Sequence, residues 1–217
     1  MALQLQRVKD AERTLGSLVA VNVAVWAAWQ LKERWMVRHF TVSYPAIQRG
    51  RYWTLLSSAI SHQDLSHLAN NMLSLYLFGQ PLHVTIGRTR FLLLYITAGL
   101  LSNLTWLKIN GRRGGSALGA SGAVSGIITM LSMLQPLRVL TIGSVRVVAI
   151  LYALLFFGVE FWQTLRQEAL RAAMRWAISS SPSSYKDGRG YRRISDRALD
   201  EAYDAAFDDH IAHTAHW

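Results

Sequence analysis

Residues 114–137 read GGSALGASGAVSGIITMLSMLQPL, a stretch without a single Asp, Glu, Lys or Arg. An apolar run of about 20 residues is long enough to cross the ~30 Å hydrocarbon core of a bilayer as a helix. Near the start of this run lies Gly119-Ala120-Ser121-Gly122. Polar groups at membrane depth are costly unless they serve a function. We therefore expect a membrane helix that carries a serine of functional interest, Ser121.

Four other parts of the chain have the same character. Residues 14–31, 65–87 and 91–107 contain no charged side chain, and residues 139–165 contain only Arg146 and Glu160. Helices of a soluble bundle need a polar face, which these stretches lack. The sequence thus predicts an all-α, polytopic membrane bundle with five spans. The expected helices cover about residues 15–31, 66–85, 91–107, the run at 114–137 (ended by Pro136) and 139–165.

Composition narrows the function classes. The net charge is +10, but the basic residues lie between the apolar stretches, where membrane topology and anionic lipid explain them better than nucleic acid does. We expect the lipid bilayer as a partner and no nucleic acid. The chain has no cysteine, which excludes disulfides, thiolate catalysis and cysteine-ligated zinc.

The chain divides by composition into four regions. We expect a first transmembrane helix with an aromatic, interfacial loop in residues 1–48, and the core helices 2–5 in residues 49–165. Residues 166–209 are polar, and we expect them to be a loop or an insertion. Residues 210–217 read as the opening of a sixth helix that is then cut off.

Three elements could carry chemistry. A serine needs a base and positioned oxyanion donors to act as a nucleophile, and the first turn of a helix offers free N–H groups. His67 and Asn71 are four residues apart, so they share a helix face on which Asn71 could donate to an oxyanion. His213 and His216 could supply the base.

Each element has another interpretation on the residues alone. The Gly-x-Ser-Gly sequence suits close helix packing, and Asn71 suits an interhelical hydrogen bond. His62 is interpreted as an interfacial or loop-ordering histidine. The histidines at 210, 213 and 216 could bind zinc, but no His-Glu-x-x-His pattern supports a metalloprotease, so we expect no metal and no cofactor.

In this order and on these helices, the motifs resemble the rhomboid intramembrane serine proteases, and most of all their mitochondrial, PARL-type branch. The matching stretches are residues 50–58, 61–79, 98–103, 118–122 and 212–217. The resemblance implies a rhomboid-like bundle of five spans plus the start of a sixth. It assigns Ser121 as the nucleophile and His216 as the base, with His213 as the alternative, and it assigns Asn71 and His67 as oxyanion donors.

The resemblance also implies a function. A serine-type endopeptidase of this family cleaves single-span membrane protein substrates through a Ser-His dyad. The compartment would be the mitochondrial inner membrane if the PARL-type resemblance holds, and the plasma membrane or another membrane otherwise. The alternative is a catalytically inactive rhomboid-like protein that binds or escorts membrane clients.

One departure from the family concerns the end of the sequence. The Gly pair that follows the family's catalytic histidine is missing, because the sequence stops at Trp217, and we interpret this as truncation of the sixth helix. A base must be held rigidly beside its nucleophile, and chain ends fray. We therefore expect residues 1–217 alone to have little protease activity.

Overall fold

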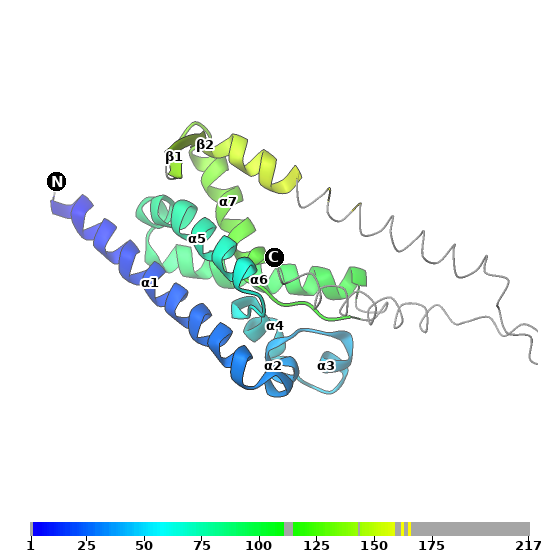
Figure 1. The fold of residues 1–217 in the computed structure, drawn as a ribbon. Helices are drawn as coiled ribbons and strands as arrows, with labels where there is room; N and C mark the ends of the chain where they lie inside the picture. The colour runs from blue at the N-terminus through cyan, green and yellow to red at the C-terminus, as the bar shows by residue number, and fades with distance from the viewer. Residues whose placement is uncertain (1, 111–114, 143, 159–161, 163–164, 166–217) are drawn as a thin grey trace, which may run out of the picture. The chain divides into compact units, whose positions relative to one another are not determined.

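The structure is a computed structural model that describes residues 2–110, 115–142, 144–158, 162 and 165. Nearly all described elements are helical (Figure 1). They belong to a compact unit formed by residues 1–112 and 116–155, and the last helix runs on to Gly158. The elements are α1 (Ala2–Leu31), α2 (Glu33–Phe40), α3 (Tyr44–Gln48), α4 (Thr54–Ser57), the 3₁₀ helix η1 (Ser58–Ile60), α5 (Leu65–Ile86), α6 (Arg88–Asn110), α7 (Ser121–Leu134), β1 (Val139–Ile142), β2 (Val145–Val148) and a helix over Ala149–Gly158.

The long helices agree with the charge-free stretches. α5 and α6 lie within three residues of the expected bounds. α1 begins earlier than expected, because residues 2–13 contain no Gly or Pro and consist mostly of good helix formers. The expected interfacial connection before α5 holds the short elements α2, α3, α4 and η1.

The expected helix at 139–165 is wrong for its first ten residues. Residues 139–142 and 145–148 form an antiparallel hairpin in which Val139 pairs with Val148 and Leu140 with Val147, and the helix begins only at Ala149. β-Branched side chains lose χ1 freedom in a helix and favour strands. Apolar character alone does not distinguish a buried strand from a buried helix. The β-branched residues of this stretch are Val139, Thr141, Ile142, Val145, Val147 and Val148.

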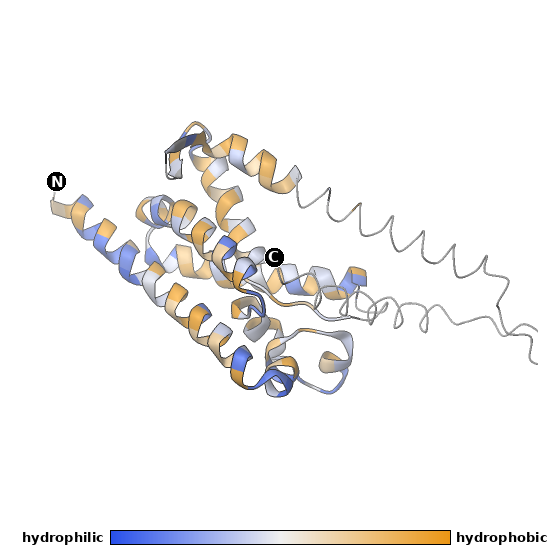
Figure 2. Ribbon diagram, viewed as in Figure 1, coloured by the Kyte–Doolittle hydropathy of each residue, from blue (hydrophilic) through white to orange (hydrophobic). Residues whose placement is uncertain are grey.

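Two described helices, α1 and α6, are both long and apolar enough to cross a membrane. α7 and the helix Ala149–Gly158 are apolar but shorter, and α5 is long but carries several polar side chains. Figure 2 shows apolar residues along most of these helices and polar residues at the N-terminal part of α1. The full number of spans stays a prediction.

Small residues let α6 and α7 approach closely. A Cβ atom on Gly126 would lie 2.6 Å from Cβ of Ala98, and one on Gly122 would overlap the side chain of Ser102. Gly99 of α6 faces Ala123 of α7 and also Ala59 of η1. Close backbone approach at small residues is a common way for membrane helices to associate.

We expect Gly126→Ala to destabilise the protein, because the added methyl group has no space against Ala98. The free energy of unfolding should fall by about 1–3 kcal/mol. SDS titration of the purified protein in micelles measures it. Gly16→Ala is the matched control, since a Cβ there meets nothing within 4 Å and alanine favours a helix by up to ~1 kcal/mol. Equal losses in both variants would contradict the packing argument.

Candidate active site

Ser121 is the first residue of α7, and Ala120 is its N-cap. This placement agrees with the expectation that Ser121 lies in the first turn. The first hydrogen bond of the helix runs from N of Val124 to O of Ala120, at 2.9 Å. The N–H groups of Ser121, Gly122 and Ala123 therefore have no acceptor within the helix. Together with the helix dipole, they favour a negative charge that develops beside Ser121.

The loop that leads into α7 is held by backbone atoms of distant segments. Ala117 and Val42 exchange two hydrogen bonds of 2.9 Å. N of Gly119 donates to O of Ser58 at 2.9 Å. Every backbone donor of such a loop needs a partner where water is scarce. These contacts fix the approach of the chain to Ser121.

The segment that holds this loop is itself tied to two long helices. Nδ2 of Asn103 in α6 donates to O of Leu55 at 2.8 Å and to Oγ of Ser58 at 2.9 Å. Nε1 of Trp29 in α1 donates to Oγ of Ser61 at 2.8 Å. Since these residues are buried or half-buried, the loop is positioned by the bundle itself.

Gly119 brings Ser121 and His67 together. Its φ of +130° is rarely adopted by other residues. A Cβ atom at this position would lie 2.7 Å from Cε1 and 3.1 Å from Nε2 of His67, and 3.8 Å from Oγ of Ser121. The imidazole of His67 and the hydroxyl of Ser121 thus border the same side of Gly119. Glycine is required there both for its conformation and for the space.

His67 lies at the start of α5, where Asp64 is the N-cap. Oδ1 of Asp64 accepts hydrogen bonds from Oγ of Ser66 at 2.6 Å and from N of His67 at 2.8 Å. These bonds, the one from Ser66 above all, lower the pKa of Asp64, so its carboxylate stays ionised. The cap fixes the first turn of α5 and with it the backbone of His67.

Asn71 is buried one turn further along α5, on the same face as His67. Its Nδ2 donates to O of His67 at 3.0 Å. This bond lies within α5 and is not the interhelical bond that the sequence left open. Among the described residues, the structure shows no hydrogen bond between Asn71 and Ser121.

His62 has a larger part in the site than the sequence suggested. Its side chain is fully buried, and Nε2 accepts a hydrogen bond from N of Ala120 at 3.3 Å. The ring packs edge-to-face on His67 with 5.0 Å between centroids. The bond to Ala120 agrees with the loop-ordering interpretation of His62. Its position five residues before His67, on the loop that enters the same helix, was the available signal.

Burial fixes the charge state of His62. Desolvation, helped by the neighbouring His67, lowers its pKa from 6.5 to about 4. The neutral ring accepts at Nε2, so its proton is on Nδ1, which is buried without a hydrogen-bond partner in the described part of the chain. His62 therefore acts as an acceptor for the backbone near neutral pH.

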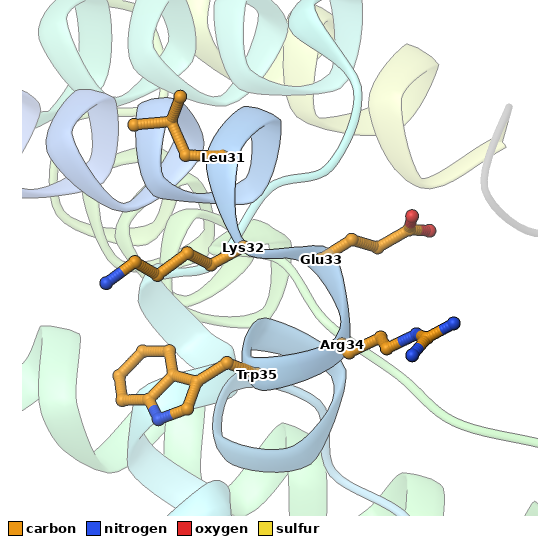
Figure 3. Close-up of a pocket in the computed structure, with 5 residues that line it drawn as sticks. All are labelled: Leu31, Lys32, Glu33, Arg34 and Trp35. Atoms are coloured by element: carbon orange, nitrogen blue, oxygen red, sulfur yellow. The ribbon is translucent and has the colours of Figure 1, made fainter.

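Three further points concern the terminal histidines, a metal site and a surface hollow. His210, His213 and His216 are outside the described residues. Within the described ranges, no group of three or more His, Cys, Asp or Glu side chains could hold a metal ion. A hollow of about 460 Å³ is lined by the consecutive residues 31–35 at the turn between α1 and α2 (Figure 3), and it contains none of the expected site residues.

Comparison with known proteins identifies the family of this chain. A family model described as "Rhomboid domain" matches residues 49–178. The chain is 32% identical over 149 residues to RHOMBOID-like protein 12, mitochondrial, of Arabidopsis thaliana, covering 61% of the chain and 44% of the relative. It is 35% identical over 127 residues to Rhomboid protein 1, mitochondrial, of Saccharomyces cerevisiae (55% and 36% covered). It is also 35% identical over 123 residues to the human Presenilin-associated rhomboid-like protein, mitochondrial (55% and 32%). The matches span less than half of the length of these relatives.

We expect His62→Gln to remove one cause of acid instability. An unfolded histidine binds a proton near pH 6.5, whereas folded His62 does so only near pH 4. Stability from this group is therefore complete above pH 6.5 and decreases as the pH falls toward about 4, by roughly 3 kcal/mol in total. Glutamine keeps an acceptor for Ala120 but does not titrate.

Unfolding free energies in micelles at about pH 7.5 and about pH 4 test this. The wild type should lose roughly 3 kcal/mol more than His62→Gln across this range. His62→Phe keeps a ring without the acceptor, so we expect it to be less stable than the wild type at the higher pH. If the free energy of unfolding falls equally in the wild type and in His62→Gln between these two pH values, His62 does not control acid stability.

Proposed function

This chain belongs to the rhomboid family, and from this premise we propose that it is an intramembrane serine endopeptidase. The family match spans more than half of the chain and includes Ser121, His67 and Asn71. The observation that carries the proposal is the meeting of the Ser121 hydroxyl and the His67 imidazole at Gly119, at the N-terminus of α7.

Ser121 is the proposed nucleophile. Its Oγ attacks the carbonyl carbon of a substrate peptide bond while its proton passes to a histidine. Resemblance to the family assigns this role to His216, with His213 as the alternative. The histidine then protonates the leaving amine, and the peptide bond breaks to leave an acyl-enzyme ester on Ser121. Water, deprotonated by the same base, hydrolyses the ester and restores the free serine.

The proposed oxyanion donors are the N–H of Ser121 and the side chains of His67 and Asn71. Two observations support them. The first-turn N–H groups of α7 have no intrahelical acceptor, and the imidazole of His67 lies beside Gly119 close to the Ser121 hydroxyl. Donors held by the fold stabilise a developing oxyanion without the cost of reorganising at the moment of reaction.

The proposed substrates are single-span membrane proteins. α7 has 14 residues and is about 21 Å long, shorter than the ~30 Å hydrocarbon core. If Leu134 at its other end lies near one membrane surface, Ser121 lies below the other. A substrate helix must unwind locally to be cut, since an intact helix keeps its carbonyls hydrogen bonded. The proposed path of entry is from the side of the bilayer, at the depth of Ser121.

We also propose a mitochondrial membrane as the compartment. The relatives from plant, yeast and human carry "mitochondrial" in their names. Cell fractionation of the tagged protein tests this, and recovery in the plasma membrane fraction would contradict it.

In a version of the protein extended through a complete sixth helix, we expect Ser121→Ala to abolish both cleavage of a single-span membrane reporter and labelling by a serine-reactive fluorophosphonate probe. Ser125→Ala, one turn along α7, is the matched control and should keep both. Cleavage that survives in Ser121→Ala would overturn the proposal. A folded wild type that neither cleaves nor reacts would favour the non-catalytic, client-binding function.

We expect Asn71→Ala to lower kcat by about 10²–10³, the typical effect of losing one oxyanion donor. The neighbouring Asn70 is exposed, so Asn70→Ala should keep the wild-type rate. Because Asn71 is buried and bonded to its own helix, unfolding free energies of both variants must be measured beside the rates. A stable Asn71→Ala protein with a wild-type kcat would remove Asn71 from the site and leave it as a packing residue.

A further inference from the structure

A second polar site lies at the other end of α5 from His67. There the N-terminal part of α1, the C-terminus of α5 and the N-terminus of α6 enclose a hollow of about 220 Å³. Three arginines line it: Arg7 from α1, and Arg88 and Arg90 from α6. Asp10 is the only acidic residue among its lining residues. None of these residues has a part in the proposed proteolysis.

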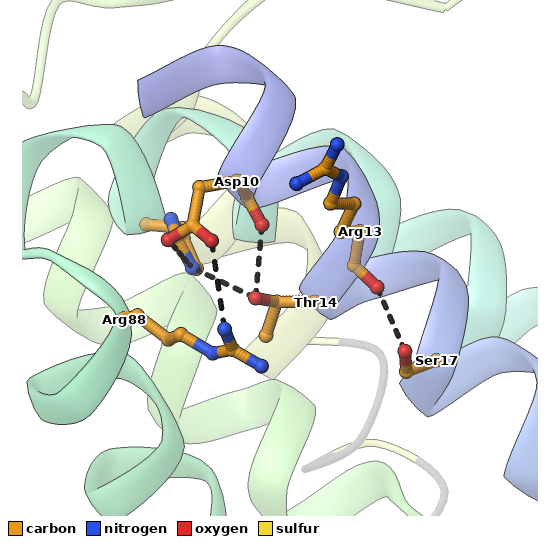
Figure 4. A network of polar contacts seen from close by, with 6 residues as sticks. Asp10, Arg13, Thr14, Ser17 and Arg88 are labelled. Atoms are coloured by element: carbon orange, nitrogen blue, oxygen red, sulfur yellow. Dashed lines mark hydrogen bonds and ion pairs between the residues drawn. The ribbon is translucent and has the colours of Figure 1, made fainter. Parts of the chain in front are cut away.

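Polar contacts tie the three helices together around this hollow. The carboxylate of Asp10 lies 3.6 Å from Arg88 and 3.9 Å from Nε2 of His83. That nitrogen is also 3.2 Å from Oγ1 of Thr14, which donates to O of Asp10 at 2.9 Å. Figure 4 shows the ion pair between the Asp10 carboxylate and Arg88. These contacts therefore hold the side chains of Asp10, Arg88 and His83 in place at the wall of the hollow.

The charges in the hollow do not cancel. Asp10 faces Arg88 and His83, and within the described part of the chain no carboxylate lies within ion-pair distance of Arg7 or Arg90. Three guanidinium groups against one carboxylate leave an excess of positive charge. The planar fork of a guanidinium matches two oxygens of a phosphate at once.

The backbone adds donors at the same place. α6 begins at Arg88, and its first hydrogen bond runs from N of Phe91 to O of Gly87 at 3.0 Å. The N–H groups of residues 88–90 therefore have no acceptor within the helix. The positive end of the helix dipole thus lies where the three arginines converge, an arrangement that suits an anion.

The depth of the hollow suits a phosphate of the membrane. The charge-free part of α6 begins at Phe91, directly after Arg90, and that of α1 begins at Thr14. Arg7 precedes Thr14 by about 10 Å along the helix. Arg88 and Arg90 therefore lie just outside the hydrocarbon core, in the layer of roughly 5–7 Å that contains the lipid headgroups. The backbone of Arg7 lies further out, and Arg7 lines the same hollow.

We propose that this hollow binds a phosphate group through Arg7, Arg88 and Arg90. The phosphate is carried by an anionic phospholipid headgroup or is free in solution. Both sources present the same oxygens to the same donors, and the experiment separates them.

The first arm measures lipid preference of the full chain in phosphatidylcholine nanodiscs, with spin-labelled phosphatidylglycerol or phosphatidylcholine as the probe. We expect the wild type to prefer phosphatidylglycerol. The double variant Arg7→Gln/Arg90→Gln should lose this preference by up to about fivefold for each arginine. Arg88 is kept because it pairs with Asp10. The control, Arg34→Gln/Arg38→Gln, removes two exposed charges from α2 and should keep the preference.

The second arm measures binding of inorganic phosphate to the same proteins in micelles by calorimetry. Binding that is lost only in Arg7→Gln/Arg90→Gln, without any lipid preference, supports a site for soluble phosphate. Lipid preference lost only in that variant supports the headgroup. Equal losses in both double variants would show diffuse surface charge, and that result, or wild type without binding in either arm, overturns the proposal.

Discussion

The hydrogen bond from Gly119 to Ser58 is the contact on which the arrangement of the candidate site depends. It belongs to a loop without regular structure, and in a membrane protein such backbone is tolerated only where its polar groups have partners inside the protein. Ala117 is paired with Val42, Gly119 with Ser58 and Ala120 with His62. Together these bonds set the angle at which α7 begins. Because two of the three partners are backbone carbonyls or amides, the arrangement depends on the path of the preceding chain as much as on its side chains.

That path is set in turn by the packing of the long helices. Asn103 of α6 fixes the α4–η1 segment, and Ser102 and Ala98 of the same helix receive Gly122 and Gly126 of α7. The glycines bring the two helix backbones close, and the asparagine fixes the segment that holds the loop. A change of spacing between α6 and α7 would therefore shift Ser121 and its supporting loop together. This coupling explains why small residues are gathered at one interface, while larger apolar residues such as Phe78 and Leu131 fill the rest of the core.

The sequence predicted the parts of this molecule that follow from local rules. Charge-free runs located α5 and α6 within a few residues, and the four-residue spacing placed His67 and Asn71 on one face. The position of Ser121 in the first turn also followed, although the helix starts seven residues later than the apolar run. The hairpin at 139–148 was missed because an apolar stretch of β-branched residues suits a buried helix or a strand equally well. The contact of His62 with Ala120 joins residues 58 positions apart in the chain, and no local pattern encodes it. The pairing of Asp10 with His83 and Arg88 was out of reach for the same reason.

The shortness of α7 has a consequence for water. The proposed hydrolysis needs a water molecule at Ser121, yet the hydrocarbon core contains almost none. A helix about 9 Å shorter than the hydrocarbon core of the bilayer leaves a hydrophobic mismatch, which is relieved by local thinning of the membrane or by polar groups at the short end. In this fold the free N–H groups of the first turn of α7 are such polar groups, and the backbone bonds of the preceding loop keep them in place. The length of α7 thus determines the depth at which water reaches the helix bundle. A thicker membrane would raise the free-energy cost of hydrating Ser121.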